Sequence, residues 1–157
     1  MRNLETVIIP EGVTTLKDLA FWGCNNLKSV SIPNSLVSVA HMDLFTSGDH
    51  LEKVEVSPDH PLFAVENRAL INKQDRMLIR FLDHEQTGVY EISRGIRELG
   101  SDAFAYSRLS SVIIPDTVTT LGSGAFLNCE NLAEIVIPDS VVVERLVRMI
   151  EEKVSWI

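Results

Sequence analysis

Clustered basic residues and long apolar runs are both missing from this sequence, and each absence excludes a class of partner. Its 157 residues include 22 acidic and 14 basic side chains, which gives a net charge of −8 at pH 7. Nucleic acids and anionic membrane surfaces are bound through concentrated Lys and Arg, so we expect neither as a partner. No apolar run reaches the ~18 residues that a membrane-spanning helix needs, and we therefore expect no membrane insertion.

An export signal is also missing. The first residues, MRNLETVIIPEGV, contain one Arg and a short apolar stretch that Pro, Glu and Gly follow at once. A secretory signal has a longer apolar segment and a small-residue cleavage site. Two interpretations stay open: the chain is cytoplasmic, or Met1 begins a piece of a longer chain.

What the sequence does contain is a repeated segment. Residues 4–26 read LETVIIPEGVTTLKDLAFWGCNN, and residues 109–131 read LSSVIIPDTVTTLGSGAFLNCEN. In each, alternate apolar residues predict a short strand, Pro ends it, a turn follows, and Ala-Phe and Cys fill the interior. Repetition at this spacing is the signature of a solenoid, in which each unit stacks on the one before.

Weaker copies of the segment fill most of the remaining chain, so we expect residues 1–157 to form a single domain. Residues 57–86 interrupt one copy and have no counterpart elsewhere. Their apolar runs alternate with polar turns, which predicts a small β-meander or hairpin projecting from the stack. The expected repeats are 4–26, 27–50, 51–86 with the inserted meander at 57–86, 87–108, 109–131 and an unfinished one at 132–139.

Residues 140–157 depart from the repeat and predict a helix. Ser140 suits the N-cap, and apolar side chains recur at helical spacing from Val143 to Ile157. The last unit of a solenoid otherwise exposes apolar side chains and a strand edge, so we expect this helix to cap the C-terminal end. A membrane-binding helix is the alternative, but its polar face carries as many acidic as basic side chains.

The only two cysteines, Cys24 and Cys129, occupy the same position in the first and last complete repeats. Rungs stacked roughly 4.8 Å apart hold them well beyond about 10 Å from each other. A disulfide needs Cα atoms within about 7 Å, so we predict two free, buried thiols.

No motif for catalysis, metal binding or cofactor binding emerges, and we expect no enzyme. Gly122-Ser123-Gly124 lacks the Lys of a phosphate-binding loop and repeats scaffold positions. His50, Asp59 and His60 could be imagined as metal ligands, but no spacing places them on one face. An enzyme with its site beside His60 and His84 is the least favoured alternative. We expect exposed loop positions for all four histidines: His41, His50, His60 and His84.

The outward strand positions form the predicted partner-contact face, because a solenoid displays its ligand surface there. Ile113 and Val136 are apolar neighbours, and acidic side chains accompany them. The alternative is that β-propensity alone fills a face without function. The predicted contact residues are Ile8, Ser31, Glu55, Glu91, Ser111, Ile113, Glu134 and Val136.

The repeated combination of strand Leu, Val and Ile with Pro, Val, Leu-Gly, Ala-Phe and Cys resembles the BspA-like, or Treponema pallidum-type, leucine-rich repeat. Residues 4–26 and 109–131 match it nearly throughout, and residues 27–50 and 87–108 match with substitutions. The resemblance implies an α/β repeat solenoid, a right-handed superhelix with short parallel strands. Its members are typically bacterial or protist surface or secreted proteins, and some resemble adhesins that hold host matrix proteins.

These observations favour a non-catalytic protein-interaction module within an adhesin-like protein that is exposed on a cell surface or secreted. The expected partner is a protein. The alternative is a structural or self-associating spacer, because no cap is evident before the first strand and two such edges could pair into a homodimer.

Overall fold

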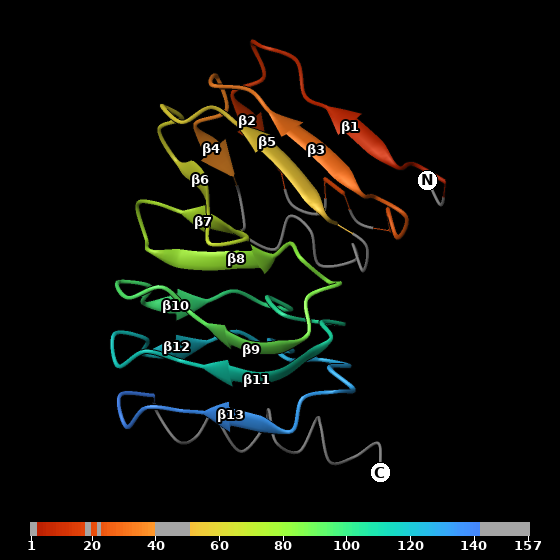
Figure 1. Ribbon diagram of the computed structural model, residues 1–157. Coiled ribbons are helices and arrows are strands. Elements are labelled where there is room, and N and C mark those ends of the chain that lie inside the picture. The colour runs from red at the N-terminus through yellow and green to blue at the C-terminus, as the bar shows by residue number, and fades with distance from the viewer. Residues whose placement is uncertain (1–2, 18–19, 22, 40–50, 142–157) are drawn as a thin grey trace.

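The computed structural model describes residues 3–17, 20–21, 23–39 and 51–141. Over these ranges the chain forms thirteen short strands joined by turns, and none of the described residues is helical. The strands stack as successive coils of a β-solenoid (Figure 1). The stacked coils agree with the predicted solenoid, whereas the helical part of the α/β expectation is not found in this part of the chain.

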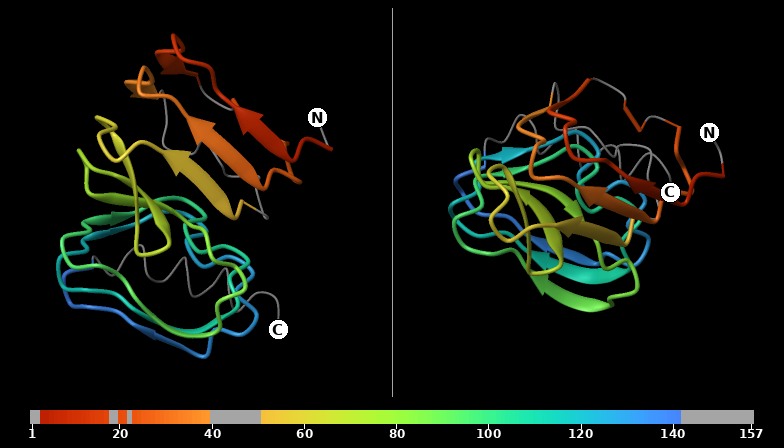
Figure 2. Two further views of the ribbon diagram at one scale, coloured as in Figure 1. Left: turned by 45° about the horizontal axis from the view of Figure 1, so that its top comes forward. Right: turned by 90° about the horizontal axis from the view of Figure 1, so that it is seen from above.

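The first strands of the coils form two parallel sheets rather than one. One sheet contains β1 (Thr6–Ile8), β3 (Ser29–Ile32) and β5 (Lys53–Val56), and the other contains β9 (Gly88–Glu91), β11 (Leu109–Ile113) and β13 (Glu134–Val136). Figures 1 and 2 show the first three strands side by side at one end of the molecule and β9, β11 and β13 towards the other. The face that the repeat pattern predicts is therefore divided.

The second strands of the coils are only two residues long. β2 (Thr15–Leu16) pairs with β4 (Ser38–Val39), and β10 (Glu98–Leu99) pairs with β12 (Thr120–Leu121), in both cases in parallel. In the second pair Leu99 is aligned with Leu121, and both side chains are buried. In the first pair Leu16 is aligned with Val39, and both are partly buried.

An antiparallel meander occupies the insert. It consists of β6 (Phe63–Glu66), β7 (Ala69–Asn72) and β8 (Met77–Phe81), as the alternation of apolar runs and turns predicts. β8 also pairs in parallel with β10, with Leu78 aligned to Leu99. The last strand of the meander thus takes the place of a coil strand.

The expectation that the meander projects from the stack is wrong. All four residues of β7 are buried, and successive side chains face different cores. The buried apolar side chains form two cores, one mainly within the first coils (the N-terminal core) and one within the later coils (the C-terminal core). Leu70 packs in the N-terminal core, whereas Ala69 and Ile71 pack in the C-terminal core. A strand that is apolar on both faces must be covered on both, which requires a place inside the fold. The meander therefore lies between the two cores and packs against both.

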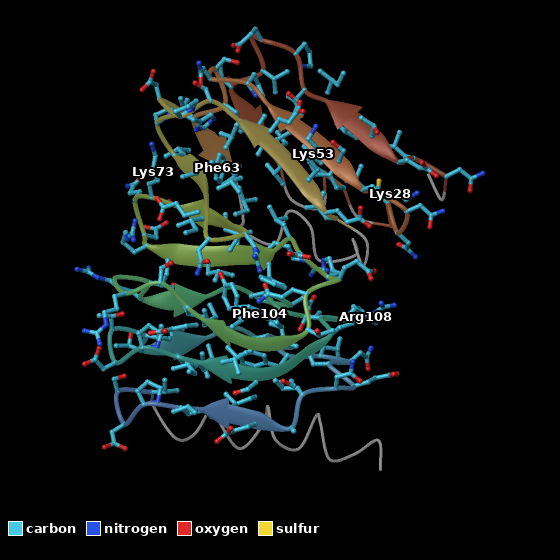
Figure 3. All side chains as sticks on the ribbon, viewed as in Figure 1. Lys28, Lys53, Phe63, Lys73, Phe104 and Arg108 are labelled. Carbon is cyan, nitrogen blue, oxygen red and sulfur yellow. The ribbon has the colours of Figure 1, made fainter. Side chains whose placement is uncertain are left out.

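Aromatic stacking shows how the meander continues the repeat. Phe104 and Phe126 hold the same position in consecutive repeats, and their rings stack with centroids 5.3 Å apart. Phe81 of β8 stacks on Phe104, also at 5.3 Å. Figure 3 shows Phe104 inside the coils, with Lys28 and Arg108 at the periphery. The meander thus supplies one rung of the aromatic row.

The coil corners are fixed by a row of hydroxyl groups. Ser35 donates to the Val13 carbonyl at 2.9 Å, and Thr117 donates to the Ile96 carbonyl at 2.7 Å. Both hydroxyl residues lie two positions after the Pro of their repeat, Pro33 and Pro115. Each hydroxyl satisfies a carbonyl of the preceding coil, which stabilises the turn without needing regular ladder bonds.

Ser140, the predicted N-cap of the C-terminal helix, belongs to this row. Its hydroxyl donates to the Val118 carbonyl at 2.7 Å, and the Val141 N–H donates to the Pro138 carbonyl. Residues 138–141 thus repeat the turn of residues 115–118. The rest of the predicted capping helix, residues 142–157, lies outside the described residues.

Candidate functional site

His60 is buried, against the expectation of an exposed loop residue. Its Nδ1 accepts hydrogen bonds from the backbone N–H groups of Leu62 and Phe63, each at 3.1 Å. The proton must therefore sit on Nε2, which donates to the Pro33 carbonyl at 3.1 Å. Burial lowers the pKa of His60; the Pro33 bond opposes that shift, and the charge of Lys73 adds to it. This neutral ring attaches the meander to the second coil.

The remaining candidates for chemistry do not converge. His84 is half-buried beside Phe81, and the His41 and His50 predictions lie outside the described residues. Within the described ranges, no group of three or more His, Cys, Asp or Glu side chains is placed to hold a metal ion. Among the same residues, no helix is long and apolar enough to cross a membrane.

Both cysteines are free and buried, as predicted from the repeat spacing. Cys24 packs in the N-terminal core and Cys129 in the C-terminal core. The Cys129 thiol donates to the Phe104 carbonyl at 3.0 Å and lies 3.4 Å from the Ser107 hydroxyl. The meander separates the two thiols, which act as small core side chains.

The predicted contact residues separate into two groups. In the sheet of β1, β3 and β5, called the N-terminal sheet, Ile8 is aligned with Ser31 and Ser31 with Glu55. In the C-terminal sheet, two outward rows run across the strands in register. The first row is Val89, Ser111 and Glu134, and the second is Glu91, Ile113 and Val136. These six residues are called the C-terminal strand face below.

Exposure differs sharply within this face. Val89 on β9 is 60% exposed, and Val136 on β13 is 46% exposed. Ile113, on the middle strand β11, is half-buried. Ser111 was predicted as a contact residue but is only 8% exposed, so it contributes little to the accessible surface. Val89 was not among the predicted contacts, although its position two residues before Glu91 marks it as outward-facing. The accessible apolar surface therefore comes mainly from the two valines and Ile113.

The two halves also differ in how their charges are compensated. In the N-terminal sheet the Lys53 ammonium lies 2.5 Å from the Glu55 carboxylate, and Lys28 pairs with Glu5 at 3.4 Å. Glu91 and Glu134 are both exposed, and neither forms an ion pair with another described residue. Within the described part of the chain, the C-terminal strand face therefore has carboxylates without an ion-pair partner beside apolar side chains.

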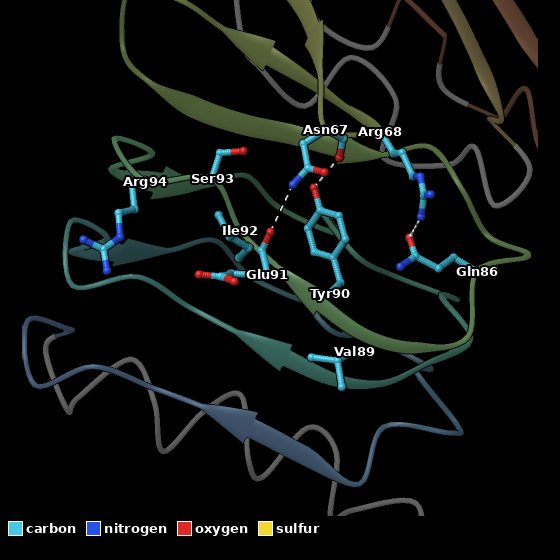
Figure 4. Close-up of a pocket in the computed structure, with 9 residues that line it drawn as sticks. All are labelled: Asn67, Arg68, Gln86, Val89, Tyr90, Glu91, Ile92, Ser93 and Arg94. Atoms are coloured by element: carbon cyan, nitrogen blue, oxygen red, sulfur yellow. Dashed lines mark hydrogen bonds between the residues drawn. The ribbon is translucent and has the colours of Figure 1, made fainter.

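The tip of the β6–β7 hairpin stands at the break between the two sheets. Asn67 and Arg68 form the turn with φ of 45° and 62°. The Asn67 side-chain amide donates to the Glu91 carbonyl at 3.0 Å, and the Tyr90 hydroxyl donates to the Asn67 carbonyl (Figure 4). Burial raises the pKa of Tyr90 to about 12, so its hydroxyl remains a donor. The hairpin tip is thereby fixed to β9.

An open, polar hollow of about 530 Å³ lies between the hairpin tip and β9. Arg68 lines it and donates to the Gln86 side chain, while also pairing with Asp83 at 3.6 Å. Arg94 lines the same hollow as Glu91 (Figure 4). The hollow is lined by residues of the hairpin tip, of β9 and of the segments on either side of β9.

The chain resembles known proteins both in its repeat family and in its fold. The family model described as the BspA type leucine rich repeat region, found in six copies, matches residues 1–73 and 83–145. No curated protein matches the chain significantly. The chain is similar to a solved leucine rich cell surface protein from Faecalibacterium prausnitzii, with 26% identity and a TM-score of 0.70. That alignment covers 89% of this chain and 43% of the other.

Two further solved structures share the fold. The pneumococcal vaccine antigen PcpA aligns with a TM-score of 0.66 and 24% identity over 88% of this chain and 32% of its own. A leucine-rich repeat protein from Eubacterium ventriosum aligns with a TM-score of 0.65 and 18% identity over 90% of this chain and 47% of its own. The chain thus spans less than half the length of these three proteins. By its repeats, its stacked coils and the family model, it belongs to the BspA type leucine-rich repeat family.

Proposed function

We propose that the chain is a non-catalytic protein-interaction module and that its partner binds the C-terminal strand face. The observation that carries this proposal is the exposure of Val89 and Val136 on the two outer strands, with Ile113 between them. Apolar side chains gathered on a fixed face favour association because burial removes them from water. The parallel ladder and the core below hold these side chains in place before binding, which lowers the entropic cost of association.

The N-terminal sheet supports the proposal less well. Ile8 is 75% exposed, but its aligned neighbours across the sheet are Ser31 and then Glu55. An isolated exposed apolar side chain is common on protein surfaces and needs no partner. We therefore assign the main contact to the C-terminal half and leave Ile8, Ser31 and Glu55 as secondary contacts.

We further propose that the module belongs to an adhesin-like protein on a cell surface. The solved relative from Faecalibacterium prausnitzii is named a cell surface protein, and another is named a vaccine antigen. In this proposal residues 1–157 form one domain, the coils wind into a right-handed superhelix, and a helix within residues 142–157 covers the last coil. That cover would protect the outer edge of β13, which pairs only with β11 among the strands that the structure describes.

Binding to a panel of purified host extracellular matrix proteins tests the proposal. The triple variant Val89→Ser, Ile113→Ser, Val136→Ser removes the apolar part of the face without touching the core row. Ile8→Ser is the matched control in the N-terminal sheet. We expect a panel member to bind the wild type and the control but not the triple variant. Binding that survives the triple substitution would refute the assignment of the face.

A second candidate function is self-association through the N-terminal edge. Among the described strands, β1 pairs only with β3, and side chains of the first coil such as Val7 and Leu16 are only partly buried. An open edge with apolar flanks can pair with a second copy. Sedimentation would then give a dimer for the wild type and a monomer for Val7→Pro. A monomeric wild type would contradict this candidate.

A further inference from the structure

We infer that the C-terminal strand face binds an extended segment in which one apolar side chain lies between two basic ones. This inference rests on the proposed function, because it names the chemistry of the partner for the same face. It follows from the pattern of six side chains, their spacing and their charges.

The pattern is a grid of three strands with two outward positions each. Two carboxylates, Glu91 and Glu134, occupy opposite corners of the grid, and Val89 and Val136 occupy the other two. The middle strand contributes Ile113 and the nearly covered Ser111. Ser111 is the smallest side chain of the grid and lies between Val89 and Glu134 in its row. An apolar side chain of a partner placed over the centre of the grid can contact Ile113 and the two valines.

The spacing of the carboxylates indicates how the partner is built. Neighbouring strands lie about 4.8 Å apart and residues i and i+2 about 6.6 Å apart, so the Cα atoms of Glu91 and Glu134 are separated by about 12 Å. In an extended segment, residues i and i+4 face the same side about 13 Å apart, with residue i+2 midway. A basic residue at each end and an apolar residue in the middle therefore match the diagonal of the grid.

The charges favour basic rather than acidic flanks. No outward position of β9, β11 or β13 carries a basic side chain. Among the described residues, the cations that line the hollow beside Glu91 are Arg68, which pairs with Asp83, and Arg94, which forms no ion pair with Glu91. A basic partner residue can thus approach Glu134, which no described cation pairs with, and can approach Glu91 with Arg94 as a weak competitor. In the N-terminal sheet, Lys53 already compensates Glu55, so the same partner has little reason to bind there.

Two synthetic peptides with blocked ends provide the probes. The first contains the sequence Lys-Ser-Leu-Ser-Lys, and the second contains Glu-Ser-Leu-Ser-Glu and is otherwise identical. Each is titrated at low salt into the isotope-labelled chain, and amide chemical shifts report the site and the affinity. We expect the basic peptide to shift amides of β9, β11 and β13 and to bind more tightly than the acidic one.

The double variant Glu91→Gln, Glu134→Gln should weaken the basic peptide about fivefold, since two exposed ion pairs contribute roughly 1 kcal/mol together. Glu52→Gln, Glu55→Gln is the matched control on β5 and its approach, and it should change the affinity little. If the acidic peptide binds these strands as well as the basic one, the inferred charge preference is wrong although the face still binds. If neither peptide shifts these amides, the inference is overturned, while the triple serine variant separately decides the proposed function.

Discussion

Gly122 and Gly100 hold the same position in consecutive coils but differ in the space beside them, which makes a sharp test of the stacking. A Cβ added at Gly122 would lie 2.4 Å from both the Gly100 carbonyl carbon and the Ser101 nitrogen. At Gly100 the nearest atom would be the Leu78 carbonyl oxygen at 3.3 Å. The atoms met by Gly122 belong to the backbone, so no side chain can rotate away to relieve the contact.

The expected magnitudes follow from these distances. Overpacking of a filled interior costs about 1–3 kcal/mol, and a clash against backbone belongs at the upper end. Gly122→Ala should therefore lower the free energy of unfolding by about 3 kcal/mol. At Gly100 the tight but tolerable contact is offset by the lower entropy of Ala in the unfolded chain, about 0.4–1 kcal/mol. Gly100→Ala should thus change the free energy of unfolding by less than about 1 kcal/mol.

Urea denaturation followed by circular dichroism measures both variants against the wild type. The two substitutions add the same methyl group at equivalent positions, so propensity and solvation cancel in the comparison. A difference between them of less than about 1 kcal/mol would show that adjacent coils do not approach as closely as the structure indicates. The Leu-Gly pair of the repeat would then need another explanation.

Three further outcomes follow from the described contacts. Phe81→Ala should cost about 3–4 kcal/mol of unfolding free energy in urea denaturation, because it removes a rung of the aromatic row; a cost below about 1 kcal/mol would favour a projecting meander. The native pKa of His60 is lowered, so its contribution is present above pH ~6.5, the unfolded value, and is lost as pH falls through the native pKa. Urea midpoints between pH 7.5 and 5 should therefore fall more steeply for the wild type than for His60→Asn, and equal slopes would contradict this. Tyr106 has φ of 63° where Asn128 has 53° in the next repeat, so Tyr106→Asn should raise stability by about 0.5 kcal/mol in thermal melts, and an unchanged or lower melting temperature would contradict this.

The sequence is sufficient to predict the coils because the repeat states the same physical requirement several times. Val30 and Val112 fall at the inward position of their strands in the pattern, and both are fully buried. Pro33 and Pro115 follow the strands that they were expected to end. Such local rules, alternation and punctuation, need no knowledge of distant contacts.

The meander shows where local rules stop. Its three strands could be predicted from their apolar runs, but its place between two cores depends on β8 pairing with β10. Leu78 and Phe81 are three residues apart, whereas Leu99 and Phe104 are five apart, so β8 does not match the repeat pattern. Its equivalence to a coil strand becomes visible only through the aligned backbone and the stacked rings.

The candidate site could be predicted only in part, again because local rules do not reveal contacts between residues distant in the sequence. Alternation correctly places Glu91, Ile113 and Val136 in one outward row, because side-chain direction is a local property. The low exposure of Ser111 depends on the neighbouring strands. The burial of His60, whose ring bonds to the Pro33 carbonyl, depends on packing against another coil. The break between β5 and β9 likewise depends on how the meander packs. No local sequence pattern within the strands predicts these features.

The affinity of a bound matrix protein for the triple serine variant, compared with Ile8→Ser, tests the central claim most directly. Loss of partial burial at Val89, Ile113 and Val136 should remove about 2–3 kcal/mol of binding free energy, or roughly 30- to 150-fold in Kd. Ile8→Ser should leave the Kd within about twofold of the wild type. A triple variant that also binds within about twofold of the wild type would contradict the claim that this face is the binding surface.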